Sequence, residues 1–321
     1  MCTGLILSRL EVPKLLIYKP MHNIKTNFDK LFPIVKEMLK DQVNDHGNYV
    51  RPGPEAEFTD LEVITLSLTS EALSIDSETY LFAKLNSEYL EDFPNLIDRS
   101  RYNVRRRALF PAIENLRKRL VLRVVESEDT FIVDSMPLEI CKISRASRAK
   151  ICKENLENFP DKGYCPSQKT YYYGYKFHGV CSVNGVFFSF DLSPASVHDI
   201  HYMKDIKNQF SNCLLLADKG YIGAEQQLSL FQTQRIQLEV PMRRNQHGYR
   251  PQAYIFRKSR KRIETLFSQL NDQFLINRNY AKSFSGFKTR VLAKLTALTI
   301  IQYLNKVILD RPINHIKHAL A

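Results

Sequence analysis

Phe131-Ile132-Val133-Asp134 decides the fold of this chain, because it is an apolar, strand-forming run that ends in an acid. Aromatic and β-branched side chains favour a strand, and an ionised carboxylate directly after a buried strand is avoided unless it binds something. The stretch Leu214–Tyr221 repeats the arrangement, since three leucines lead into Asp218 and Gly220 allows a sharp turn. If the two strands are parallel neighbours, Asp134 and Asp218 emerge at one carboxyl edge of the sheet, where open α/β sheets bind ligands.

Further strand-like stretches predict a mixed sheet. From Glu128 onward the helical period gives way to stretches rich in β-branched or aromatic residues. We expect five strands, at Thr130–Val133, Tyr171–Val183, Gly185–Leu192, Cys213–Ala217 and Gln237–Val240. Asn184-Gly185 separates the second strand from the third and is a strong hairpin signal, so these two strands should be antiparallel neighbours. Helical patterns follow the later strands, which indicates an α/β layer fold with helices flanking a five-stranded sheet.

The chain before this sheet has a helical pattern. Apolar residues recur three and four apart from Ile24 to about Val125. Thr59 and Glu62 have the spacing of a capping box, and Ser77 and Ser100 are candidate caps for the next two helices. We therefore expect an all-helical domain over residues 21–127 and the sheet domain over 128–321. Residues 1–20 have no clear pattern, and we interpret them as an extension upstream of a natural start at Met21.

The composition favours a nucleic-acid partner. The 321 residues contain 46 Lys and Arg against 34 Asp and Glu, which gives a net charge of +12 and suits a polyanion. With 44% hydrophobic and 25% charged residues, the chain is globular rather than disordered. The six cysteines form no C-x-x-C pair, and no apolar run is long and uninterrupted enough for a membrane span or a signal sequence. We expect a cytoplasmic protein with no membrane partner.

A third acid is placed by a basic helix near the C-terminus. In Arg257–Leu270 the apolar residues form one stripe, Glu264 borders that stripe, and Arg260 precedes Glu264 by one turn. Converging carboxylates raise each other's pKa unless a divalent cation binds, and an all-oxygen ligand set favours Mg²⁺ or Mn²⁺. Two such ions can drive in-line attack on a phosphodiester. Taken singly, each acid can equally be a turn residue or an ion-pair partner.

Motifs in a fixed order connect these acids to a known family. They are Phe131–Leu138 (FIVDSMPL), Gln168–Lys176 (QKTYYYGYK), Ser193–Ile200 (SPASVHDI), Ala217–Tyr221 (ADKGY) and Arg257–Leu270 (RKSRKRIETLFSQL). From Met21 to Ala321 the chain resembles the DDE transposases of bacterial insertion sequences, which have a ribonuclease-H-like catalytic domain.

The resemblance implies that Asp134, Asp218 and Glu264 are the metal ligands and the catalytic acids, with two Mg²⁺ or Mn²⁺ ions expected. It further implies metal-dependent cleavage at terminal inverted repeats, joining of the freed 3′-hydroxyl to target DNA, and at least a homodimer on double-stranded DNA. Related enzymes have a Tyr-Arg-Glu-Lys pattern around the glutamate. Arg260 and Glu264 match it, whereas the outer positions hold Arg257 and Asn271.

Two basic regions are candidate DNA contacts. The first opens a helix after Arg99 and could be the reading helix of a helix-turn-helix unit, although a solvated charged face is the alternative. Its candidate residues are Arg101, Tyr102, Asn103, Arg105, Arg106 and Arg107. The second region flanks the expected active edge and should bind phosphates through Arg243, Arg244, Arg257, Arg260 and Lys261.

His198 lies in the His-Asp motif of the family. Ser196 to Asp199 has capping-box spacing, so we expect Asp199 to stabilise a helix start and His198 to support the metal ligands or contact DNA rather than bind metal itself. Two other functions stay open at this point. One is a metal-dependent nuclease or resolvase without strand transfer, and the other is an inactive or domesticated DNA-binding copy.

Overall fold

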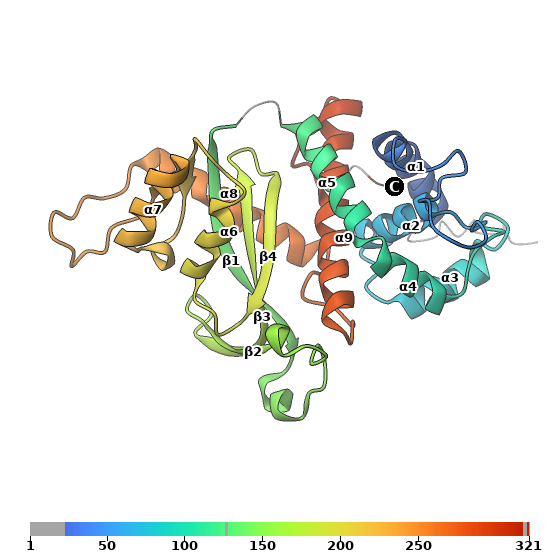
Figure 1. The fold of residues 1–321 in the computed structure, drawn as a ribbon, viewed down its shortest axis with the longest axis horizontal. Coiled ribbons are helices and arrows are strands. Elements are labelled where there is room, and N and C mark those ends of the chain that lie inside the picture. Colours follow the sequence, from blue (N-terminus) through green and yellow to red (C-terminus); the bar gives the residue numbers. More distant parts are fainter. Residues whose placement is uncertain (1–22, 126–127, 317–319, 321) are drawn as a thin grey trace, which may run out of the picture.

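The computed structural model describes residues 23–125, 128–316 and 320, and its first half is helical (Figure 1). The helices are α1 (Ile24–Leu39), α2 (Asp60–Ala72), α3 (Glu78–Glu88), α4 (Arg99–Ala108) and α5 (Phe110–Val124). This run ends just before the first strand begins at Thr130, close to the boundary that the change of hydrophobic period predicts.

Local capping explains where three of these helices begin. The capping box is confirmed, because Thr59 accepts from the backbone N–H of Glu62 while the Glu62 side chain accepts from that of Thr59. Ser77 caps α3 as expected. The cap expected at Ser100 is wrong: Asp98 caps α4 by accepting from the backbone N–H groups of Ser100 and Arg101. An ionised Asp suits a helix N-terminus because it also complements the helix dipole.

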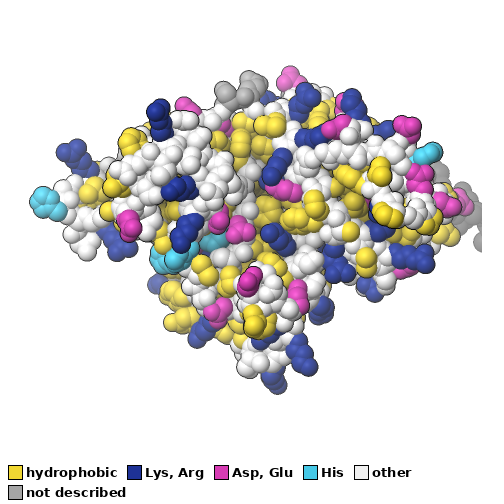
Figure 2. Space-filling view, viewed as in Figure 1, with side chains coloured by type: hydrophobic (Ala, Val, Ile, Leu, Met, Phe, Trp, Pro, Cys, Tyr) yellow, Lys and Arg dark blue, Asp and Glu magenta, His cyan; other side chains and the backbone are white. Residues whose placement is uncertain are grey.

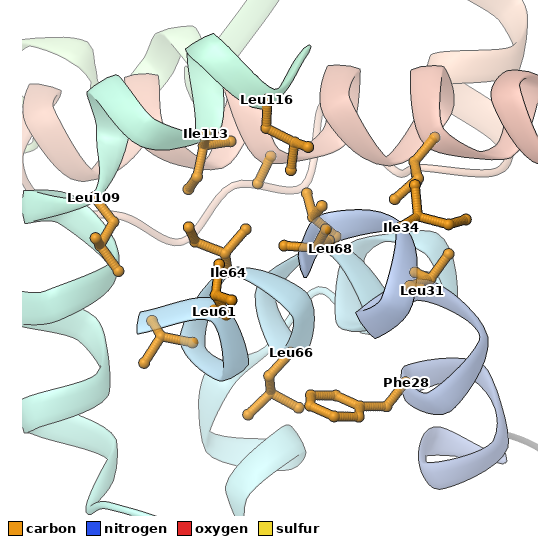
Figure 3. Close-up of a cluster of buried hydrophobic side chains, with 14 of the residues drawn as sticks. Phe28, Leu31, Ile34, Leu61, Ile64, Leu66, Leu68, Leu109, Ile113 and Leu116 are labelled. Carbon is orange, nitrogen blue, oxygen red and sulfur yellow. The ribbon is translucent and has the colours of Figure 1, made fainter. Parts of the chain in front are cut away.

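The helical half encloses its own apolar core (Figure 3). Side chains of α1 such as Phe28, Leu31 and Ile34 meet those of α2 and α5 in one buried cluster. The C-terminal helix α9 (Phe284–Tyr303) also belongs to this cluster through Leu292, Ala293 and Ile300. The helical domain is therefore completed by a segment from the far end of the chain, which the expected division at residue 128 does not include.

The second half is built on a mixed sheet. The strands are β1 (Thr130–Cys141), β2 (Asp161–Cys165), β3 (Thr170–Ser182), β4 (Phe187–Pro194), β5 (Leu214–Leu216) and β6 (Gln237–Glu239). Their order is β2-β3-β1-β5-β6, with β4 also pairing with β3. The antiparallel β3–β4 hairpin at Asn184-Gly185 and the parallel β1–β5 pair are both confirmed. Gly185 has φ +92°, the left-handed conformation that closes a three-residue hairpin loop between Ser182 and Val186.

The sheet differs from the expectation in two places. It has six strands among the described residues rather than five, because β2 lies in the basic stretch that shows no strand pattern. In addition, β1 does not end at Val133 but runs on to Cys141, since β3 is long enough to pair with it throughout. Asp134 therefore lies within a strand, opposite Gly179, and not directly after one.

Helices cover both faces of the sheet. They are α6 (Met203–Lys207), α7 (Ala224–Gln234) and α8 (Tyr254–Asp272), together with α9, which a π-helical turn extends over Leu304–Ile308. The apolar side of α8 packs against the core beneath the sheet with Phe177, Phe187 and α9 residues. The segment Phe284–Ile308 is long and apolar enough to cross a membrane, but 78% of its most apolar window is buried inside the protein. Here it is a core helix.

Candidate active site

Asp134 and Asp218 lie level with each other across the parallel β1–β5 pair. The register aligns Ile132 with Leu216, and each acid follows two residues later on its own chain segment. Asp218 comes just after the end of β5, where a short 3₁₀ turn over Lys219–Tyr221 carries the chain away. The sheet thus places both acids at one edge, as the sequence predicts, although Asp134 reaches that edge from within its strand.

The two carboxylates affect each other electrostatically. Burial and the nearby charge of Asp218 raise the pKa of Asp134 to about 7. The backbone N–H of Ser135 donates a hydrogen bond to the Asp134 side chain at 2.8 Å, and this bond opposes the rise in pKa. A cation beside this carboxylate would stabilise its ionised form.

Arg260 supplies a positive charge at this edge. Its Nη2 atom lies 3.2 Å from Oδ1 of Asp218, and its charge also favours the ionised form of Asp134. The arginine is held there by α8, whose buried residues Ile263, Leu266, Phe267 and Leu270 fix the helix against the core. The predicted role of Arg260 beside the acids therefore agrees with its position.

Glu264 is on the same helix, one turn after Arg260, and its side chain is exposed. Within residues 23–125, 128–316 and 320, no three His, Cys, Asp or Glu side chains are grouped as a metal site would need. The structure brings Asp134 and Asp218 together but does not bring Glu264 into a group with them. The convergence of all three acids stays a prediction.

A network around Asp199 supports the site, and sequence reasoning missed it. Asp199 Oδ1 accepts a hydrogen bond from the hydroxyl of Ser135 at 3.1 Å and lies 3.1 Å from Nζ of Lys176. Lys176 also donates to the carbonyl of Val197 at 2.8 Å, which fixes the loop after β4. Asp199 therefore connects β1, β3 and the following turn. The sequence signal for this network is the motif SPASVHDI, whose pattern alone indicates a helix cap.

The cap at this turn is His198 rather than Ser196. The Nδ1 atom of His198 accepts from the backbone N–H of Ile200 at 3.3 Å, and the ring is exposed. The histidine nearer to the acids is His178, which is buried, stacks on Tyr202 and bonds to the hydroxyl of Ser193 at 2.8 Å. Burial lowers the pKa of His178 to about 4, so this ring is neutral at physiological pH.

The residues at the edge have the donor chemistry that a hard divalent cation prefers. Asp134, Asp199 and Asp218 all lie near Tyr221 and raise the pKa of its phenol, after burial as the main cause. The Tyr221 hydroxyl is buried and has no hydrogen-bond partner among the described residues. The carboxylate oxygens of Asp134 and Asp218 suit Mg²⁺ or Mn²⁺ better than a soft metal.

Several of the predicted DNA contacts on α4 are instead structural. Tyr102 is fully buried, and Arg106 is 2% exposed and lies 2.6 Å from Glu78. Arg105 pairs with Asp60 at 2.5 Å, and Asn103 donates to Glu78 at 2.9 Å. The prediction that Tyr102 and Arg106 contact DNA is therefore wrong for this conformation, because neighbouring helices supply partners for the polar face of α4. Arg101 is exposed beside Asp98, and Arg107 is half-buried.

The other predicted basic residues are accessible. Arg243 and Arg244 are exposed in the loop before α8, and Arg257 and Lys261 are exposed on α8 itself. Lys and Arg side chains are spread over both halves of the molecule on the face that Figure 2 shows. The basic residues around α8 can thus meet a polyanion that approaches the Asp134–Asp218 edge.

Comparison with known proteins identifies the second half of the chain. Residues 126–300 match a family model described as a transposase DDE domain. This stretch contains both aspartates, the Asp199 network and Glu264. No curated protein and no solved structure in the comparison matches the chain.

Proposed function

Because the chain belongs to the DDE transposase family, which makes it a nucleotidyl-transferase type of enzyme, we propose that it is the transposase of an insertion sequence. It binds the terminal inverted repeats of the element, cleaves the DNA there and joins the freed 3′-hydroxyl to a target. The observation that carries this proposal is the alignment of Asp134 with Asp218 beside Arg260 at one edge of the sheet.

We assign the catalytic metal ligands to Asp134, Asp218 and Glu264, with two Mg²⁺ or Mn²⁺ ions expected. When bound, divalent ions supply an activated water or 3′-hydroxyl and charge stabilisation at the leaving oxygen. Support comes from the carboxylate pair, whose repulsion a cation would relieve, and from the position of Glu264 one turn beyond Arg260 on α8. The order of the acids along the chain is that of the family.

The surrounding residues hold the acids and receive the substrate. Asp199, which pairs with Lys176, accepts a hydrogen bond from the hydroxyl of Ser135, and the backbone N–H of Ser135 donates to Asp134. The guanidinium of Arg260 is placed to bind a phosphate oxygen when DNA reaches the edge, since Arg recognises phosphate through several N–H donors. Arg243, Arg244, Arg257 and Lys261 extend this positive surface along the DNA backbone.

The proposal includes a homodimer on DNA, since two element ends must be held together, and a cytoplasmic location beside the chromosome. The test is incubation of the purified protein with Mg²⁺, DNA ends that are already cleaved, and a target plasmid. Joined products are expected from the parent protein and none from Asp134→Asn. Cutting of uncleaved ends without joining would indicate a nuclease or resolvase, and DNA binding without either reaction would indicate an inactive copy.

A further inference from the structure

A second site lies away from the aspartates, in a cleft between the two halves of the protein. The cleft has a volume of about 900 Å³ and is lined by α3 and α4, by residues near Lys150 and by the segment that leads into α9. Figure 2 shows Lys and Arg side chains on both sides of the notch between the helical half, on the right, and the lower lobe. The lining includes none of the residues assigned to the active site.

The lining of this cleft has an excess of positive charge. It contains seven Lys or Arg residues and three carboxylates. The carboxylates are already engaged: Glu78 pairs with Arg106 at 2.6 Å, Asp76 lies 3.8 Å from Arg278, and Glu154 accepts from the backbone N–H of Phe284. The cationic side chains still outnumber the carboxylates, so the lining keeps an excess of positive charge.

Five of these cations have no acidic partner in the part of the chain that the structure describes. They form none of the ion pairs found among these residues and are Arg99, Arg107, Lys150, Lys153 and Lys282. They come from α4, from the segment before β2, and from the loop before α9, so three separate parts of the fold direct positive charge to one place. Like charges repel, and such a convergence is favourable only when an anion occupies it.

Buried N–H groups in the cleft also lack acceptors. Arg106 is 2% exposed, yet its Nε atom has no hydrogen-bond partner among the described residues, and the same holds for Nε of Arg107. A buried donor without an acceptor is costly, and native proteins seldom leave one. Both Nε atoms are enclosed by protein and cannot reach a duplex directly, so they contribute only positive charge beneath the surface of the cleft.

The start of α9 adds a third source of positive potential. Ser283 and Gly286 line the cleft, and Ser283 caps this 20-residue helix by accepting from the backbone N–H of Gly286. The dipole of a long helix favours negative charge at its N-terminus, and the carboxylate of Glu154, which accepts from the backbone N–H of Phe284, already takes part of this position. The cleft thus combines unpaired guanidinium and ammonium groups with a helix N-terminus that Ser283 and Glu154 partly cap.

We infer that this cleft binds the phosphate backbone of a DNA duplex, so that one DNA segment contacts both α4 and the entrance to α9 at a distance from the catalytic aspartates. The inference rests on the proposed function only in taking DNA as the polyanion. It assigns to Arg107, Lys150 and Lys282 the role of phosphate contacts and leaves the buried Arg106 as part of the lining beneath them.

The test compares two charge-reversal variants in a DNA-binding titration without divalent metal. Lys150→Glu combined with Lys282→Glu alters the cleft, and Lys30→Glu combined with Lys36→Glu makes the same change of charge on exposed lysines of α1. Fluorescence anisotropy of a labelled duplex, between about 50 and 200 mM salt, gives the affinity and its salt dependence. Thermal denaturation of each protein checks that it is folded.

The cleft variant should bind at least about tenfold more weakly than the parent, and its salt slope should fall by about 2, one contact for each lysine lost. The α1 variant should stay within about twofold of the parent. If the reversal variant does not fold, the Lys150→Gln and Lys282→Gln pair tests the same contacts with a smaller loss. Equal affinities for parent and cleft variant, or equal losses in both variants, would overturn the inference.

Two further outcomes separate the possible failures. Thermal denaturation of each protein is repeated with inorganic phosphate. If phosphate stabilises the parent but not the cleft variant, while both proteins bind DNA equally, the cleft is a site for small phosphates and the inference is wrong. If the parent binds no DNA at all, the proposed function fails with it. If the parent joins DNA ends and the cleft variant binds them as tightly, only the inference fails.

Discussion

The guanidinium of Arg260 lies 3.2 Å from the carboxylate of Asp218, where its positive charge also favours the ionised form of Asp134. The ion pair joins α8 to the end of β5 and so aligns the helix that carries Glu264 with the sheet edge that carries Asp134. The pair makes α8 part of the site even though Glu264 itself is exposed.

Replacement of Arg260 should affect the reaction more than DNA binding. Arg260→Gln removes a charged donor aimed at the phosphate, and we expect the rate of strand transfer at saturating DNA to fall by about 10²-fold or more. Arg257→Gln, one turn earlier and exposed on the same helix, is the matched control and should change the rate little. Equal rates for the Arg260 variant and the parent would remove Arg260 from the site.

Removal of the acids should abolish cleavage while DNA binding is kept. Asp134→Asn, Asp218→Asn and Glu264→Gln each delete a proposed ligand, and we expect each to reduce cleavage by about 10³-fold or more, as loss of a group essential to the transition state does. Gel-shift affinity for the same DNA should stay near that of the parent. A Glu264→Gln variant that cuts normally would show that the third ligand is elsewhere, with Asp199 the nearest other carboxylate in the network.

The melting temperature tests the metal assignment without a measurement of activity. Mg²⁺ bound to the native state alone should raise the melting temperature of the parent, by mass action. The increase should be absent in Asp134→Asn, which removes a ligand. This variant should itself melt higher than the metal-free parent at pH 8, because it no longer buries a charge next to Asp218. A Mg²⁺-dependent increase of the same size in both proteins would contradict the assignment.

Glu71 is the most important charge for stability. It is fully buried on α2 and pairs with Arg290 at 3.0 Å and with Lys294, both on α9. Glu71→Gln leaves two buried cations without their partner and should lower the free energy of unfolding by about 3–5 kcal/mol. Glu88→Gln, which breaks an ion pair with Lys84 at the surface, should cost less than about 1 kcal/mol. Urea denaturation at neutral pH measures both.

The same residue makes stability depend on pH. Burial alone would raise the pKa of Glu71, but the positive charges of Arg290, Lys294 and Arg106 lower it by more. The pKa of Glu71 is therefore about 2 in the folded protein, compared with 4.5 in the unfolded chain. Because the folded pKa is the lower one, this stabilisation is complete above pH 4.5 and is lost as the pH falls toward 2. Urea midpoints should therefore drop steeply between pH 4.5 and 3 in the parent and less steeply in Glu71→Gln.

Much of the fold follows from local patterns in the sequence. The capping box at Thr59 and the hairpin at Asn184-Gly185 depend on residues near each other in the chain. The two acid-bearing strands are far apart in the chain, but each has its own local pattern of apolar residues before an acid. The strand β2 could not be found in this way. It forms because β3 offers an unpaired edge. The strand needs glycine at position 163, because a Cβ atom there would come within 2.7 Å of the Ala195 carbonyl oxygen.

The candidate site was predictable in part for the same reason. Two acids after apolar runs are visible in the sequence, whereas the contact of Asp199 with Ser135 and Lys176 depends on segments brought together only by the sheet. The burial of Tyr102 and Arg106 was likewise hidden, because their partners lie on α2 and α3. A cluster of arginines has the same appearance in sequence whether it faces solvent or a buried glutamate.

The helix α9 contributes side chains to the core of the helical half and to the core beneath the sheet. A recombination event that exchanged only the N-terminal half with that of a relative would leave the new half without the helix that completes its hydrophobic core. Exchange of the whole helical module therefore requires that α9 be exchanged together with it.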